Sequence, residues 1–145
     1  CFRDVAVFAF HTQIVPITDA LRQTSLARVR NSLAMLDSGW SGGTRIGESL
    51  TQFNERYGNW VNSRTLTCVV SDGYDTGDLD SLQQALDKLK QRGRNLLWVN
   101  PLWQREGFTP ESKGMKIAMD YADQVTGAHN IETLRALGPH FTRLA

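Results

Sequence analysis

The sequence has little cysteine and no long apolar run, and both absences exclude classes of protein. Neither of the two cysteines, Cys1 and Cys68, has a metal-type ligand nearby in the sequence, so no zinc motif is present. Because Cys68 lies within an apolar run, we expect it to be a small buried side chain in a reducing compartment such as the cytoplasm. No run reaches the roughly 18 apolar residues of a membrane span, and no signal-peptide pattern is present.

A marked charge of either sign is also lacking. Sixteen basic and fifteen acidic side chains leave a formal net charge of +1, which gives no electrostatic argument for binding nucleic acid or an anionic membrane. A local group of basic residues is interpreted as a solvated helix face and its last turn: Lys88, Lys90, Arg92 and Arg94. The length and composition predict one domain, residues 1–145.

Hydrophobic spacing predicts alternating strands and helices. An early antiparallel hairpin is expected from Val5–Phe10 and Ile14–Thr18. Apolar positions at helical spacing predict helices that begin near Leu26, Ile46 and Leu79. Later signals are weaker, and they predict a helix start at Thr109-Pro110-Glu111, a short strand around Val125, and a last helix capped by Asn130 and closed by Gly138-Pro139.

The stretch from Leu66 to Leu82 organises the chain. It predicts the strand Leu66–Val70, an acidic glycine-containing loop, and a helix capped by Asp78 and stopped at Gly93. With a further strand at Leu96–Val99 this forms a right-handed, parallel βαβ unit. Ligands of such sheets bind at the carboxyl ends of the strands.

Asp72 directly follows the strand, and Gly73 lets the backbone turn away. A carboxylate there, beside hydroxyl groups of a neighbouring loop, suits Mg²⁺, which prefers hard oxygen ligands. The nearby acids have structural interpretations: Asp75 as a turn former, Asp78 as a cap, and Asp80 as a first-turn acid. A calcium loop of the EF-hand kind is unlike this spacing.

A glycine loop over residues 38–47 opens directly onto the predicted helix at Ile46. The hydroxyl of Thr44 at this junction either caps the helix or meets a ligand. The loop lacks the lysine and the preceding strand of a phosphate-binding loop. None of the histidines, His11, His129 and His140, has a cysteine or serine nucleophile in a known arrangement, so the sequence presents no convincing catalytic set.

Two strings together carry a family resemblance: Ser-Gly-Gly-Thr-Arg-Ile-Gly-Glu-Ser at 41–49 and Val-Val-Ser-Asp-Gly-Tyr-Asp-Thr-Gly-Asp at 69–78. With them the chain resembles the von Willebrand factor A (VWA) domains of the CoxE-like family, whose ATPase partners are of the MoxR type. Shorter matching strings follow in the same order: Phe8–Thr12, Trp98–Leu102, Gly114-Met115 and His129-Asn130.

The resemblance implies a Rossmann-like VWA fold, with a mostly parallel sheet, an antiparallel edge hairpin and helices on both faces. It also implies a metal-ion-dependent adhesion site (MIDAS), in which Mg²⁺, with Mn²⁺ as a substitute, joins the domain to an acidic residue of a partner. Thr44 matches the family's metal-binding threonine and Asp72 its aspartate. The supporting loop residues are Gly42, Gly43, Ser71 and Gly73.

One family element is not found. No Asp-x-Ser-x-Ser occurs, and we expect the chain to be N-terminally incomplete, without the central strand that carries this motif. Metal binding by this chain is therefore expected to be weak or absent.

The resemblance implies a non-enzymatic, cytoplasmic interaction module that works with a MoxR-type AAA+ ATPase in the maturation of a client enzyme or in metal insertion into it. Two alternatives stay open: a hydrolase or phosphotransferase that uses Asp72 with Asp75 or His11, and a structural VWA domain whose metal site has decayed.

Overall fold

The computed structural model describes residues 4–37, 43–103, 107, 109–139 and 141. Its strands form an antiparallel pair, β1 (Phe8–Phe10) with β2 (Ile14–Pro16), and a parallel three-stranded sheet. The parallel sheet has the order β3 (Leu66–Val70), β4 (Asn95–Asn100) and β5 (Gln124–Gly127). The helices are α1 (Thr18–Leu21), α2 (Leu26–Asp37), α3 (Ile46–Arg56), the 3-10 turn η1 (Gly58–Trp60), α4 (Leu79–Arg92), α5 (Lys113–Tyr121) and α6 (Ile131–Arg135).

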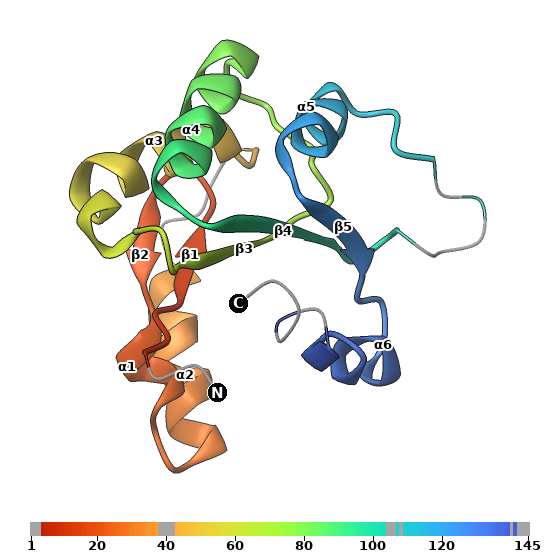
Figure 1. The fold of residues 1–145 in the computed structure, drawn as a ribbon. Helices are drawn as coiled ribbons and strands as arrows, with labels where there is room; N and C mark the ends of the chain where they lie inside the picture. The colour runs from red at the N-terminus through yellow and green to blue at the C-terminus, as the bar shows by residue number, and fades with distance from the viewer. Residues whose placement is uncertain (1–3, 38–42, 104–106, 108, 140, 142–145) are drawn as a thin grey trace.

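The helices lie on both sides of the parallel sheet (Figure 1). Helices α3, α4 and α5 occupy one side, and α6 lies on the other. This arrangement confirms the predicted α/β class, with a parallel sheet, an antiparallel hairpin and helices on both faces. No helix within the described ranges has the length and apolar character needed to cross a membrane.

The main core lies between the sheet and helices α3, α4 and α5. Its most deeply buried members include Ile46, Leu82, Leu86 and Trp98. A smaller cluster of Leu97, Val99 and Leu137 lies on the opposite face.

That opposite face is covered unevenly, which corrects one prediction. Cys68 is in register with Leu97 on β4 and shares its face, but Cys68 is exposed rather than buried. Surrounding atoms still desolvate the thiol, and this raises its pKa to about 11.

The predicted elements and the observed ones differ in two places. The hairpin strands are shorter than expected because the Thr18 hydroxyl accepts a hydrogen bond from the Val7 N–H (2.8 Å), and the unpredicted helix α1 begins at Thr18. The helix start predicted at Thr109-Pro110-Glu111 is wrong. Helix α5 begins at Lys113, because the Ser112 hydroxyl accepts from the Met115 N–H and caps it there.

Candidate functional site

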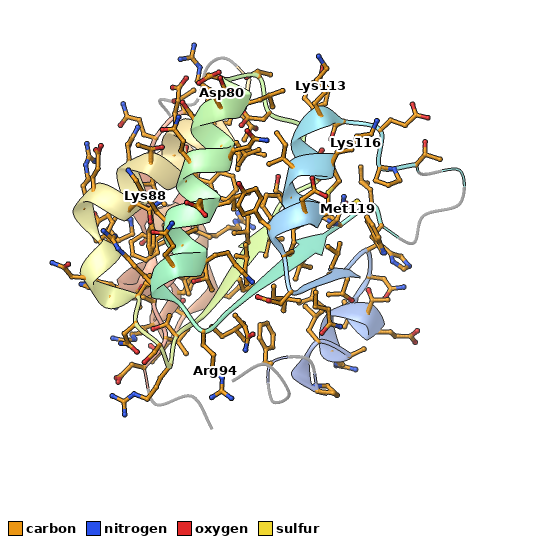
Figure 2. All side chains as sticks on the ribbon, turned by 45° about the horizontal axis from the view of Figure 1, so that its top comes forward. Asp80, Lys88, Arg94, Lys113, Lys116 and Met119 are labelled. Carbon is orange, nitrogen blue, oxygen red and sulfur yellow. The ribbon has the colours of Figure 1, made fainter. Side chains whose placement is uncertain are left out.

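Asp72 lies in the loop of residues 71–78, which joins β3 to α4, at the end of the sheet where α4 and α5 begin. Figure 2 shows Asp80 and Lys113 marking these two helix starts. The Asp72 carboxylate is exposed, and its Oδ1 accepts a hydrogen bond from the Tyr74 N–H (3.0 Å). Gly73 has φ +77°, a conformation that suits glycine and turns the chain directly after Asp72.

Three side chains from other segments hold the backbone of this loop. The indole Nε1 of Trp98 donates to the Ser71 carbonyl (2.9 Å), the Asn100 amide donates to the Asp72 carbonyl (3.4 Å), and the Ser112 hydroxyl donates to the Gly73 carbonyl (3.0 Å). Trp98 and Asn100 are fully buried on β4. Three successive carbonyl groups are therefore bound from inside the fold, which leaves the Asp72 side chain directed outward.

None of these three residues is assigned a site role from the sequence. The signal that could identify Asn100 is its position as an amide directly after the apolar strand predicted at Leu96–Val99. Once buried, such an amide needs partners. Here its oxygen accepts from the Leu102 N–H (2.7 Å), while its nitrogen also contacts the sulfur of Met115 (3.3 Å).

Glycine permits α5 to approach the loop closely. A Cβ on Gly114 would lie 2.4 Å from the Gly73 carbonyl oxygen, a distance that real side chains do not tolerate. A Cβ on Gly73 would lie 2.8 Å from the Cα of Met115. The supporting role predicted for Gly73 therefore has a packing reason as well as a conformational one.

Thr44 lies on the second loop of the site, directly against the first. Its carbonyl oxygen accepts from both the N–H (2.9 Å) and the hydroxyl (3.0 Å) of Thr76. Gly43 permits this contact, since a Cβ there would lie 2.4 Å from Cγ2 of Thr76. Gly42, the other predicted supporting glycine, lies outside the described residues.

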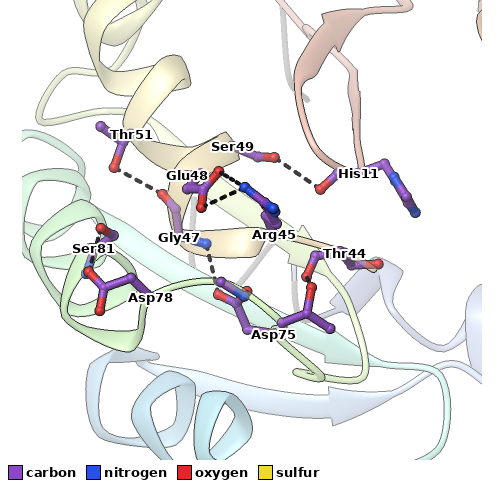
Figure 3. A network of polar contacts seen from close by, with 12 residues as sticks. His11, Thr44, Arg45, Gly47, Glu48, Ser49, Thr51, Asp75, Asp78 and Ser81 are labelled. Atoms are coloured by element: carbon purple, nitrogen blue, oxygen red, sulfur yellow. Dashed lines mark hydrogen bonds and ion pairs between the residues drawn. The ribbon is translucent and has the colours of Figure 1, made fainter. Parts of the chain in front are cut away.

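The Asp75 carboxylate joins the two loops (Figure 3). It accepts from the backbone N–H groups of Ile46 (3.2 Å) and Gly47 (2.9 Å) at the start of α3, and from Gly77 (2.8 Å) in its own loop. Arg45 occupies the N-cap position of α3 and makes no side-chain capping bond. Thr44 is therefore not the cap of α3. Asp75 takes that role from a distant segment, in addition to the turn predicted for it.

Other predicted roles are met locally. Asp78 caps α4 by accepting from the N–H groups of Asp80 and Ser81. The hydrogen bond from the Ser81 hydroxyl, together with these two backbone bonds, lowers the pKa of Asp78. The carbonyl oxygen of His11 accepts from the Arg45 N–H (2.7 Å) and from the Ser49 hydroxyl (3.4 Å), while His129 lies exposed beside Asn130. His140 is not among the described residues.

The oxygens of Thr44 and Asp72 fit a hard cation in kind. Within the described ranges, neither the Thr44 hydroxyl nor Oδ2 of Asp72 makes a hydrogen bond, so both are available as ligands. Hydroxyl and carboxylate oxygens are the donors that Mg²⁺ prefers. The same ranges hold no group of three or more histidine, cysteine, aspartate or glutamate residues that would bind a metal by themselves.

The family model described as "VWA domain containing CoxE-like protein" matches residues 1–134. No curated protein and no solved structure matches the chain. Because the family match spans nearly all of the 145 residues, the chain belongs to the family of VWA domain containing CoxE-like proteins.

Proposed function

We propose that the chain is a non-enzymatic, cytoplasmic interaction module that holds Mg²⁺ through Thr44 and Asp72 and presents it to an acidic side chain of a partner protein. Family membership implies a protein-interaction module associated with MoxR systems. The partner that we propose is therefore the MoxR-type AAA+ ATPase. The chain acts with this ATPase in the maturation of a client enzyme or in metal insertion into it.

The observation that supports this proposal is the pair of uncommitted oxygens on two joined loops. Asp75 and Thr76 hold the Thr44 loop against the loop of Asp72. Asp75 itself is a poor candidate for catalysis, because its oxygens already accept three backbone hydrogen bonds. This weakens the phosphotransferase alternative, which needs a second acid or base.

Each residue has a defined part in the proposed site. When bound, the metal supplies a positive charge that attracts a carboxylate. Ser71 and Gly73 shape the turn that directs Asp72 outward, since the Ser71 hydroxyl accepts from the Gly73 N–H (3.1 Å). Gly43 lets the Thr44 loop approach. With two protein oxygens and the other positions left to water, the affinity should be weak.

The test is a titration of the chain with Mn²⁺, a paramagnetic substitute for Mg²⁺, followed by NMR. Amide signals of residues 43–45 and 71–74 should broaden first, and excess Mg²⁺ should restore them. Asp72→Ala and Thr44→Ala should abolish this local broadening, whereas the matched control Asp80→Ala should leave it unchanged. Broadening that centres on Asp78 and Asp80, or that survives in Asp72→Ala, would refute the metal site.

Partner binding needs its own experiment. Capture of the MoxR-type ATPase by the wild-type chain should be lost on chelation with EDTA and in Asp72→Ala. If neither EDTA nor Asp72→Ala reduces capture of the ATPase, the chain binds its partner without a metal and the metal-dependent part of the proposal is refuted.

A further inference from the structure

A pocket of about 390 Å³ lies beside Asp72, between the loop after β3 and the segment that precedes α5. Its walls include Tyr74, Leu102 and Pro110, and its carboxylates are Asp72 and Glu111. The volume is within the roughly 300–1,000 Å³ found for ligand pockets. The pocket therefore has room for a side chain of another molecule.

The described part of the pocket lining carries negative charge. None of the described residues that line the pocket is basic, and neither Asp72 nor Glu111 forms an ion pair with any residue in the described ranges. Lys113 begins the next helix (Figure 2) but is not part of the lining. When a metal occupies Asp72, its charge offsets that carboxylate, and Glu111 then supplies the negative charge of the pocket. A cationic group is the complement of this charge.

The walls favour a cation on a partly apolar stem. Tyr74 is 66% exposed, so its ring is accessible to a stacking group. Leu102 and Pro110 offer apolar surface to methylene groups. Arginine combines these properties, because its planar guanidinium group stacks on aromatic faces, pairs with carboxylates and is weakly hydrated.

We propose that this pocket binds an arginine side chain of the partner protein. The proposal rests on the function proposed above for the partner's position: one acidic residue meets the metal at Thr44 and Asp72, and an arginine close to it enters the pocket. Tyr74 and Glu111 then select among acidic partner segments. A segment with a carboxylate but no arginine would contact the metal and leave the pocket empty.

The probe is the peptide acetyl-Gly-Arg-Gly-amide, and its matched control carries citrulline, an uncharged near-isostere, in place of arginine. In metal-free NMR titrations at millimolar peptide, the arginine peptide should shift the amide signals of Tyr74 and Glu111, and the citrulline peptide should bind several-fold more weakly. Glu111→Gln and Tyr74→Ala should each weaken binding roughly two- to fivefold, and the double variant roughly tenfold.

Glu55→Gln, an exposed acid on α3, is the control variant and should not change binding. Equal binding of the two peptides, shifts away from the pocket, or full binding by the double variant would overturn the proposal. Thr44→Ala separates it from the metal site: arginine binding should persist in this variant. If the wild-type chain binds the arginine peptide but not Mn²⁺, the pocket proposal stands and the metal-site proposal fails. If it binds Mn²⁺ but not the arginine peptide, only the pocket proposal fails.

Discussion

Asp75 accepts backbone hydrogen bonds from two segments that are far apart in the sequence. Bonds to a charged acceptor contribute more than neutral ones, and a lost helix cap alone costs about 0.5–2 kcal/mol. We predict that Asp75→Ala lowers the free energy of unfolding by about 2–4 kcal/mol, as measured by urea denaturation. Asp75→Asn should cost less, because one of its oxygens remains.

Asp80 provides the matched control for that prediction. It is an exposed acid in the first turn of α4, and it lacks the cross-loop bonds of Asp75. Asp80→Ala should change stability by no more than about 1 kcal/mol, through the helix dipole alone. An equal loss in the two variants would mean that the link between the loops contributes nothing specific.

A pH prediction follows from Asp123, which directly precedes β5 and whose carboxylate accepts hydrogen bonds from Lys90 of α4 and from the Leu96 N–H of β4. Partial burial alone would raise the pKa of its carboxyl, but hydrogen bonds from Lys90 and from the Leu96 N–H outweigh burial and lower the pKa below its ordinary value of 3.8. The folded state therefore binds fewer protons than the unfolded chain at acidic pH. The stability from Asp123 is present above the unfolded pKa and is lost as the pH falls through the folded pKa.

Accordingly, Asp123→Asn should be less stable than the wild type at pH 6, and the difference should shrink below about pH 4. Thermal unfolding of both proteins across this range measures it. Asp120→Asn, an exposed acid on α5, is the control and should follow the wild type at every pH. A difference that stays constant down to the lowest pH would exclude this linkage.

Strand β3 is paired on one side only within the described part of the chain. The Ser71 N–H donates to the Val99 carbonyl oxygen of β4 (3.0 Å). Because N–H groups along a strand alternate in direction, those of Val69 and Thr67 also point toward β4. Cys68 and Val70 then direct theirs toward the hairpin side. We predict that these two amides exchange with solvent at least about tenfold faster than those of Thr67 and Val69 in hydrogen-exchange NMR. Equal protection would show that another strand covers this edge.

Elements with a complete local signal were predictable. Strand β3 has its predicted bounds, and α4 begins after Asp78 and ends before Gly93 as expected, because cap, spacing and stop agree there. The hairpin ends were not, because the Thr18 hydroxyl bonds the backbone of Val7, and short-range patterns do not contain that contact. The start of α5 was missed for another reason: its cap is local, from Ser112 to the Met115 N–H, but the Thr109-Pro110-Glu111 signal precedes it in the sequence.

The molecule as a whole shows the same limit at the candidate site. Thr44 and Asp72 could be named from the sequence because family strings surround them, and their loops meet in the structure. The contacts that hold those loops join segments far apart in the chain. Asp75 binds the start of α3, and Trp98 and Asn100 bind the loop of residues 71–78 from β4. Their roles depend on how the sheet and helices assemble, which spacing alone does not specify.

The hydrogen bond from Trp98 to Ser71 has an optical consequence. This indole is fully buried, and its N–H meets the carbonyl group next to Asp72 (2.9 Å). Fluorescence of an indole depends on the polarity and hydrogen bonding around it, so Trp98 is an intrinsic fluorescent reporter of the Ser71 carbonyl group. We expect a ligand that binds Asp72 and shifts this carbonyl group to change the emission of Trp98, with no label attached to the surface where the partner binds.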